Sequence, residues 1–113
     1  MLKVLKSSIF LFFLFVKVLY ANVIDIDNEE IKKLLKKKGF SIYKPGQLSI
    51  PHQIYLFNNA KIIIGAHGAA FANLVFCKSG TRIIELMSNH HPNTVSKTIS
   101  KTKKLKYKMI RSK

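Results

Sequence analysis

Three consecutive isoleucines, Ile62 to Ile64, do most to limit what this chain can fold into. The run shows no polar alternation, so it predicts a strand over residues 61–65 that is buried on both faces. Strands of that kind belong to parallel sheets that carry helices on both sides. Shorter apolar segments at residues 40–43 and 82–86 predict two further strands, with 61–65 in the centre of the sheet.

Helical patterns alternate with these strands. Residues 28–38 place apolar side chains at helical spacing, with Asp27 or Asn28 as the N-terminal cap and Gly39 as the stop. Ser49 can cap a second helix at 50–59, and residues 69–76 predict a short third helix. Alternating helices and strands imply an α/β fold, here a small parallel Rossmann-like sheet with flanking helices.

The length of 113 residues suits about one small domain, which we place at residues 22–96. Before it, residues 1–21 contain an unbroken apolar run from Ile9 to Val16 behind two lysines. Three interpretations are open: a signal or membrane anchor, a buried strand or helix, and a start left by truncation of a longer gene. The first implies a membrane-associated or secretory protein, and the second permits a cytoplasmic one.

Residues 97–113 carry eight basic residues and no acidic one. A segment of one charge sign is often disordered or attracted to anionic surfaces, so we predict a basic tail. Met109 and Ile110 could dock a helix of this tail on the domain. The tail and residues 1–21 make a membrane surface a candidate partner.

The formal net charge of +15 raises the question of nucleic-acid binding. Base-specific contacts rely on arginine, and here only Arg82 and Arg111 are arginines. No aromatic residues are interleaved with the lysines as a stacking platform would require. We therefore predict a lysine-rich, solvated surface and no nucleic-acid partner.

Two other features predict no special chemistry. Cys77, the only cysteine, lies in an apolar run and is expected to be an inert core thiol. Adjacent His90 and His91 rarely point at one ion, and no cysteine or acid follows at ligand spacing, so we predict a loop and no metal site.

The junction around His67 is the strongest functional signal. His67 follows the carboxyl end of a predicted central strand, where ligands of open parallel sheets bind. The next helix offers unpaired backbone N–H groups that suit phosphate. The histidine is surrounded by residues with no side chain or only a methyl group, so the backbone can approach an anion. These residues are Gly65, Ala66, Gly68, Ala69 and Ala70. The alternative is a tight turn in which His67 only caps a helix.

Glu85 is the second candidate, because it is the only acid after Glu30 and lies near the end of the next predicted strand. A carboxylate there could accept hydrogen bonds from the hydroxyl groups of a ribose. The alternative is a paired or solvated glutamate without a ligand.

Residues 56–86, LFNNAKIIIGAHGAAFANLVFCKSGTRIIEL, resemble the C-terminal signature of glycosyltransferase family 61. That signature is a strand ending in Gly-x-His-Gly-Ala-Gly, a short helix with an Asn, then Pro-Gly-Thr and a strand ending in Ile-Glu. The matching positions are Gly65, His67, Gly68, Ala69, Asn73, Gly80, Thr81, Ile84 and Glu85. Upstream, Asn28 to Ile31, Gly39, Leu48-Ser49 and Gln53 also look like the family. Ala70 and Ser79 depart from it, where Gly and Pro are usual.

The resemblance implies part of one half of a two-domain GT-B-type glycosyltransferase, namely the half that binds the nucleotide-sugar donor. It implies inverting transfer to a glycan acceptor, for instance in surface or capsular polysaccharide synthesis, without an obligatory metal or other cofactor. His67 would be catalytic, and the substrate-binding residues would be Gly65, His67, Gly68, Ala69, Ala70, Asn73 and Glu85. The base that deprotonates the acceptor is expected elsewhere, so the chain alone is expected to be inactive. Alternatives are a non-catalytic remnant, a nucleotide-binding module that needs a separate acceptor domain, and a basic membrane-surface protein.

Overall fold

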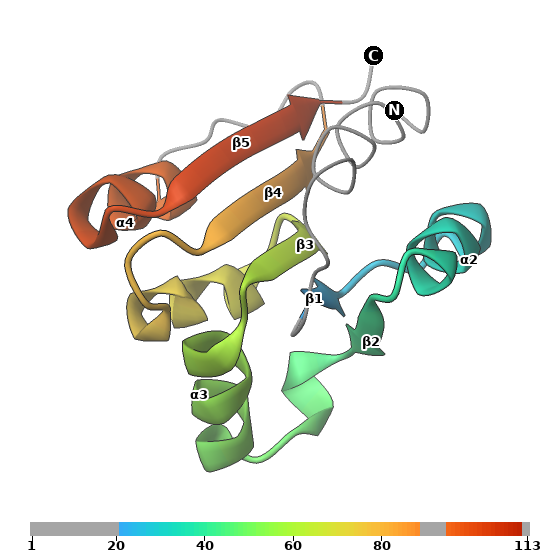
Figure 1. The fold of residues 1–113 in the computed structure, drawn as a ribbon, viewed down its shortest axis with the longest axis horizontal. Coiled ribbons are helices and arrows are strands. Elements are labelled where there is room, and N and C mark those ends of the chain that lie inside the picture. Colours follow the sequence, from blue (N-terminus) through green and yellow to red (C-terminus); the bar gives the residue numbers. More distant parts are fainter. Residues whose placement is uncertain (1–20, 89–94, 112–113) are drawn as a thin grey trace.

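A five-stranded parallel sheet forms the centre of the computed structural model, which describes residues 21–88 and 95–111 (Figure 1). The strands are β1 (Ala21–Ile24), β2 (Ser41–Tyr43), β3 (Ile62–Ala66), β4 (Arg82–Met87) and β5 (Lys106–Arg111). They lie in the order β2-β1-β3-β4-β5, and every neighbouring pair is parallel. The predicted parallel sheet with residues 61–65 at its centre is confirmed.

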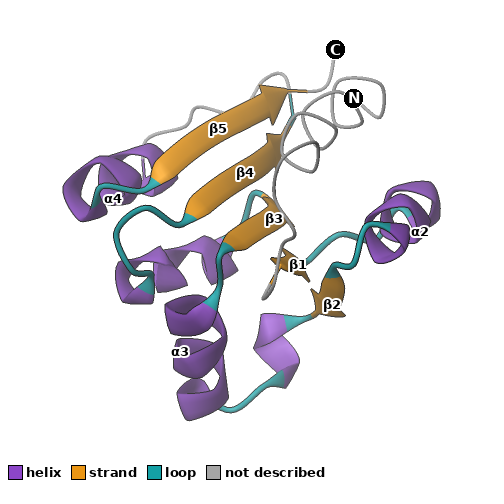
Figure 2. Ribbon diagram, viewed as in Figure 1, coloured by secondary structure: helices purple, strands orange, loops and turns teal. Residues whose placement is uncertain are grey.

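The helices cover both faces of the sheet, as Figure 2 shows. They are α2 (Glu29–Lys37), the 3₁₀ turn η1 (Pro45–Gln47), α3 (Ile50–Asn59), the 3₁₀ helix η2 (Ala69–Phe76) and α4 (Val95–Lys103). Side chains of α2 pack on one face, and those of α3, η2 and α4 pack on the other. The three predicted helices are confirmed, although residues 69–76 adopt the tighter 3₁₀ form.

The non-alternating isoleucine run is explained by this two-sided cover. Ile62 and Ile64 join the core cluster on the α2 face, and Ile63 joins the cluster on the opposite face. Ile63 is 1% exposed and Ile64 is 0% exposed, so both faces of β3 are buried. A fully buried strand needs no polar positions, which is why the run contains none.

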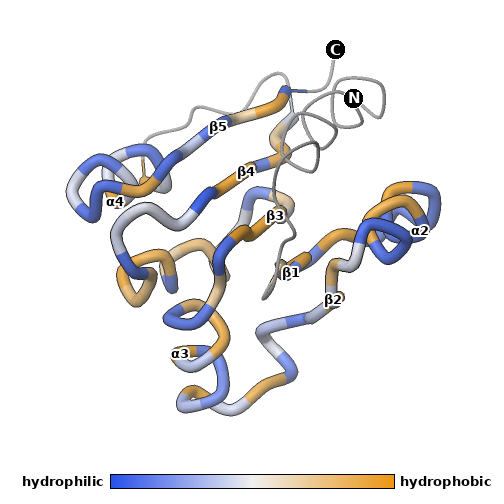
Figure 3. Tube along the Cα trace, viewed as in Figure 1, coloured by the Kyte–Doolittle hydropathy of each residue, from blue (hydrophilic) through white to orange (hydrophobic). Residues whose placement is uncertain are grey.

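Helix α2 follows the capping rules closely. The Asn28 side chain accepts a hydrogen bond from the Ile31 backbone N–H at 3.0 Å, so Asn28 is the cap rather than Asp27. Gly39 ends the helix with a φ of 93°, a conformation that favours glycine. Ile31 and Leu35 are buried while the lysines face outward, and hydrophobic and hydrophilic residues accordingly alternate along α2 in Figure 3.

The predicted basic tail is wrong for the described residues. Val95–Lys103 forms α4, and Lys106–Arg111 forms β5, which pairs with β4 at the edge of the sheet. Met109 and Ile110 therefore belong to a strand and not to a docked helix. Lys106 and Lys108 are exposed while Ile110 is buried, so the like charges point to solvent and do not oppose the pairing.

Strand β1 was not predicted, although it separates β2 from β3. It is only four residues long and fully buried, and Ala21 belongs to it rather than to the preceding hydrophobic segment. Residues 1–20 lie outside the described residues, so the three interpretations of that segment stay predictions. Within the part of the chain that the structure describes, no helix is long and apolar enough to cross a membrane.

Candidate functional site

The strand order creates a crevice between β1 and β3. The chain leaves β1 toward α2 on one face, and it leaves β3 toward η2 on the other face. Ligands of open α/β sheets bind at such a point, outside the carboxyl ends of the strands. A cleft of about 360 Å³ opens there; its walls are Asp25 to Asn28, Ile31, Ala66 and Leu86 to Ser88.

His67 directly follows β3 at this edge. Its backbone N–H donates a 2.8 Å hydrogen bond to the carbonyl oxygen of Leu86, which ties the residue to the end of β4. Its ring nitrogen Nδ1 lies 2.9 Å from Oε2 of Glu85. The side chain is 27% exposed, so the ring connects a buried carboxylate with the surface.

Glu85 lies beneath His67 and is 0% exposed. The Ser96 hydroxyl donates to Oε2 at 2.9 Å, and the Tyr107 hydroxyl donates to Oε1 at 2.5 Å. Among the described residues, the carboxylate thus has three side-chain partners, and a buried carboxylate requires such partners. Glu85 is thus a paired glutamate, and its predicted contact with a ribose stays untested.

Gly65 has a packing role that the sequence analysis did not identify. A Cβ atom on Gly65 would collide with Ile24 Cγ1, and would lie 2.9 Å from the Ile24 carbonyl oxygen and 3.0 Å from Phe71 Cε2. The residue is buried within β3. The missing side chain therefore allows β1 and η2 to approach β3, and the predicted contact of Gly65 with a ligand stays untested.

The next small residues are the ones that reach the surface. Gly68 and Ala69 are exposed, and Ala70 is half-buried against the core. Gly68 has extended backbone, and a Cβ there would find its nearest atom, the Ala66 carbonyl oxygen, at 4.0 Å. Space rather than backbone strain thus distinguishes Gly68. Contact of these three residues with a ligand stays a prediction.

Asn73 links two helices. Its amide donates to Oε1 of Gln53 at 2.9 Å, and the Gln53 amide donates to the Leu48 carbonyl oxygen at 3.1 Å. Three positions of the family resemblance therefore form one chain of hydrogen bonds between η2 and α3. This arrangement gives Asn73 a structural role, and its predicted contact with substrate stays untested.

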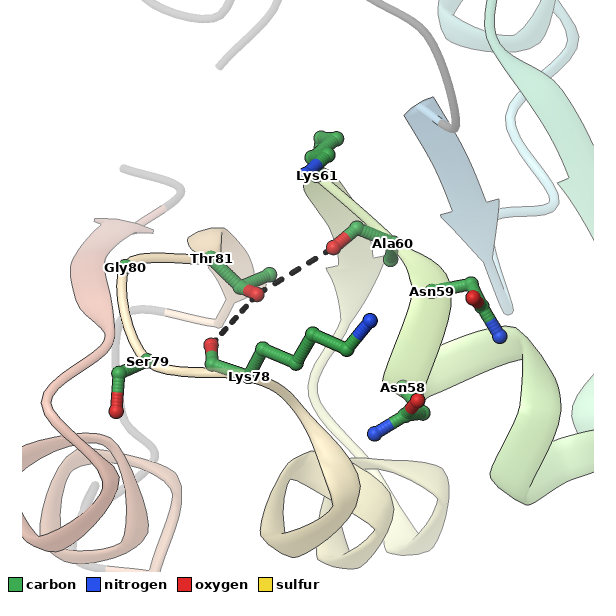
Figure 4. A pocket seen from close by; sticks show the side chains of 8 residues that line it. All are labelled: Asn58, Asn59, Ala60, Lys61, Lys78, Ser79, Gly80 and Thr81. Carbon is green, nitrogen blue, oxygen red and sulfur yellow. Dashed lines mark hydrogen bonds between the residues drawn. The ribbon is translucent and has the colours of Figure 1, made fainter.

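A smaller hollow of about 220 Å³ lies at the opposite edge, where β3 and β4 begin (Figure 4). The Thr81 hydroxyl lies 2.8 Å from the Lys78 carbonyl oxygen and 3.4 Å from that of Ala60. In Figure 4 the Lys78 side chain extends toward the C-terminal end of α3, where a cation is favourable. Thr81 thus joins two loops far from His67, and its match to the family has a structural explanation.

The first turns of α2 and η2, which both lie at the carboxyl edge of the sheet, differ in charge. Four of the five acidic residues of the chain, Asp25, Asp27, Glu29 and Glu30, precede or begin α2. Burial raises the pKa of the Asp25 carboxyl, the nearby Asp27 raises it further, and Lys44 lowers it. Helix η2 has no acidic residue in its first turn. An anion is therefore better accommodated at η2 than at α2.

Cys77 and the histidine pair were the two remaining candidates of the sequence. Burial raises the pKa of the Cys77 thiol to about 12, although Lys103 lowers it, so the thiol stays protonated at neutral pH. His90 and His91 lie outside the described residues. Within residues 21–88 and 95–111, no group of three or more His, Cys, Asp or Glu side chains could hold a metal ion.

Ser96 and Tyr107, which donate hydroxyl hydrogen bonds to Glu85, were not predicted from the sequence. The high lysine content of residues 97–113 hid a period-two pattern at residues 106–110, in which exposed lysines alternate with Tyr107 and Met109. That pattern is typical of a strand, and it indicates that Tyr107 lies on the less exposed face of that strand.

Comparison with known proteins adds one match. A family model described as Glycosyltransferase 61 matches residues 22–84, which is more than half of the chain. The match ends just before Glu85, and α4 and β5 follow it. No curated protein is similar enough to the chain to count as a match.

Proposed function

Because the chain belongs to glycosyltransferase family 61, we propose that it is the donor-binding half of a nucleotide-sugar-dependent enzyme that transfers its sugar with inversion. Glycosyltransferases act on a donor and an acceptor. In this proposal the donor's diphosphate binds at His67 and the start of η2. The observation that carries it is the contact between His67 and buried Glu85 at the carboxyl end of the central strand.

The hydrogen-bond donors at this edge suit a diphosphate. Glu85 is a buried carboxylate beside Nδ1 of His67, and it accepts a hydrogen bond from that nitrogen. In the complex the ring would carry a proton on each nitrogen, so that Nε2 donates to a phosphate oxygen while Nδ1 donates to Glu85. The backbone N–H groups that begin η2 add further donors without an acidic neighbour in its first turn.

The chemistry at this site would be stabilisation of the leaving group. The bond between the anomeric carbon and the diphosphate oxygen breaks, and its electron pair goes to the diphosphate. Donors held in position for that developing charge lower the barrier. The acceptor oxygen bonds to the opposite face of the sugar and loses its proton to a base, which we assign to a separate acceptor-binding half of the GT-B type. Binding one substrate does not by itself accelerate transfer, so we expect nucleotide binding without turnover from this chain.

Calorimetric titration with UDP and GDP tests the proposal. A hydrogen bond to a charged group is worth about 1.5–3 kcal/mol, so His67→Ala should weaken diphosphate binding about tenfold or more. His52→Ala is the matched control, since His52 is an exposed histidine on α3. This variant should bind UDP and GDP as tightly as the wild type does.

A second variant tests the space beside the ring. Gly68→Val keeps an allowed backbone and meets no close protein atom, so it should remain folded and yet exclude the diphosphate. Equal affinities of the wild type and His67→Ala would refute the phosphate role. A folded wild type without measurable affinity would indicate a remnant that has lost its ligand.

We further propose that the protein works on surface or capsular polysaccharide, at a membrane or on the secretory route. The apolar run from Ile9 to Val16 and the net charge of +15 support this setting. Co-sedimentation with anionic vesicles at low and high salt tests it, because binding through lysines should fall as salt rises. Equal recovery with neutral and anionic vesicles would contradict it.

A further inference from the structure

Two side chains that follow the family-model match reach the buried carboxylate under His67. They are Ser96 at the start of α4 and Tyr107 on β5. We propose that Ser96 and Tyr107 are positioning residues, which hold Glu85 and through it fix the His67 ring for a ligand. The importance of that ring for the diphosphate rests on the function proposed above, whereas the positioning itself does not.

The geometry around Glu85 requires donors. The carboxylate is 0% exposed, and a charge at that depth is costly unless hydrogen bonds satisfy its oxygens. Tyr107 serves Oε1, while Ser96 and His67 share Oε2. If both hydroxyls were removed, His67 would be the remaining member of this trio, and the carboxylate could turn within the space they leave.

The sheet register explains how Tyr107 reaches Glu85. In the pairing of β4 with β5, Ile83 lies opposite Tyr107 and Glu85 lies opposite Met109. Tyr107 and Glu85 are therefore diagonal neighbours on one face, at a separation that a long aromatic side chain spans. Ser96 is 1% exposed and approaches the same carboxylate from α4. Two different elements thus hold one anionic group.

The consequence for the histidine concerns its protons. An ionised carboxylate only accepts hydrogen bonds, so the His67 nitrogen that faces Glu85 carries a proton. A fixed partner at Nδ1 sets the tautomer of the neutral ring and its orientation. Any hydrogen bond between the ring and a ligand then involves Nε2. Residues 95–111 would in this way determine which ring nitrogen a ligand meets.

The test uses the full chain, labelled with ¹⁵N, and the variants Tyr107→Phe, Ser96→Ala and the double variant. Each change removes a hydroxyl and little else. The two-bond ¹H–¹⁵N spectrum of the His67 ring, identified by its loss in His67→Ala, reports which nitrogen is protonated. Tyr55→Phe and Ser41→Ala are matched controls at exposed positions on α3 and β2. Thermal melting shows that each variant is folded.

Without nucleotide, and at a pH at which the ring is neutral, we expect a single tautomer with its proton on Nδ1 in the wild type and in both controls, and a mixture of tautomers in the double variant. UDP affinity should fall about threefold or more with each lost hydroxyl. An unchanged ring spectrum in a folded double variant would overturn the proposal. If Tyr107→Phe does not fold, Ser96→Ala decides by the same spectrum. A mixture of tautomers in the double variant, together with a wild type that does not bind UDP, would support the positioning role and refute the diphosphate site.

Discussion

At the scale of single residues, Gly65 has a packing role, because a side chain there would meet Ile24 and Phe71. We predict that Gly65→Ala destabilises the fold by about 1–3 kcal/mol, because the added methyl overpacks the contact with Ile24 and Phe71. Gly46→Ala is the control, since a Cβ there meets no atom within 4 Å. Urea unfolding of the two variants measures the difference. Equal stability of both would mean that β1 and β3 can separate without cost.

Asp25 is a second residue with a measurable consequence, because its backbone has a φ of 51° and its carboxyl has a raised pKa. An acid with a raised pKa in the folded state holds more protons there than in the unfolded state. Stability therefore falls as pH rises from the ordinary value of 3.8 through the raised value. Asp25→Asn removes this penalty and keeps a residue type that tolerates positive φ.

We therefore expect Asp25→Asn to melt at a higher temperature than the wild type at pH 7, with the gain disappearing as pH falls below 3.8. Melting curves of both proteins at matched pH values measure this. Glu30→Gln is the control, since a negative charge in the first turn of α2 is favourable and its removal should bring no gain. A gain for Asp25→Asn that is independent of pH would exclude the ionisation as its cause.

At the scale of elements, the start of α2 depends on one side chain. Asn28→Ala removes the acceptor of the Ile31 backbone N–H and should cost about 1 kcal/mol. Asn28→Asp keeps an acceptor and should restore most of that stability. Lys33→Ala, on the exposed face of the same helix, should be neutral. Denaturant titration of the three variants checks the order, and an equal cost for Ala and Asp at position 28 would contradict the capping role.

The elements with a strong local pattern were the ones that the sequence predicted. Caps at Asn28 and Ser49 and the run at Ile62 to Ile64 identify α2, α3 and β3 within their own residues. Strand β1 has four residues and β5 is rich in lysine, so their assignment depends on neighbours in the sheet. His67 was found from its place after β3. Its partners on α4 and β5 follow from tertiary packing, which no local pattern contains.

At the scale of the whole molecule, residues 95–111 supply the edge strand of the described sheet and two hydroxyl partners of Glu85. A chain without residues 89–113 would expose the edge of β4 and remove Ser96 and Tyr107 from the buried Glu85. We predict that it loses cooperative thermal unfolding, because a small domain has only about 5–15 kcal/mol to lose. Removal of residues 112–113 alone is the control and should leave melting unchanged. Cooperative melting of the shorter chain at the original temperature would show that the segment is dispensable.

The all-parallel sheet also affects the order in which contacts form during folding. No two neighbouring strands are joined by a hairpin, and each crossover contains a helix or 3₁₀ segment. Contacts of that kind form late, because a long loop must close before any pairing stabilises it. The ribosome synthesises the chain from the N-terminus, so His67 and Glu85 are added before Tyr107. A newly made chain therefore carries His67 and Glu85 before it contains Tyr107, so this hydrogen-bond group can form only after β5 has been made.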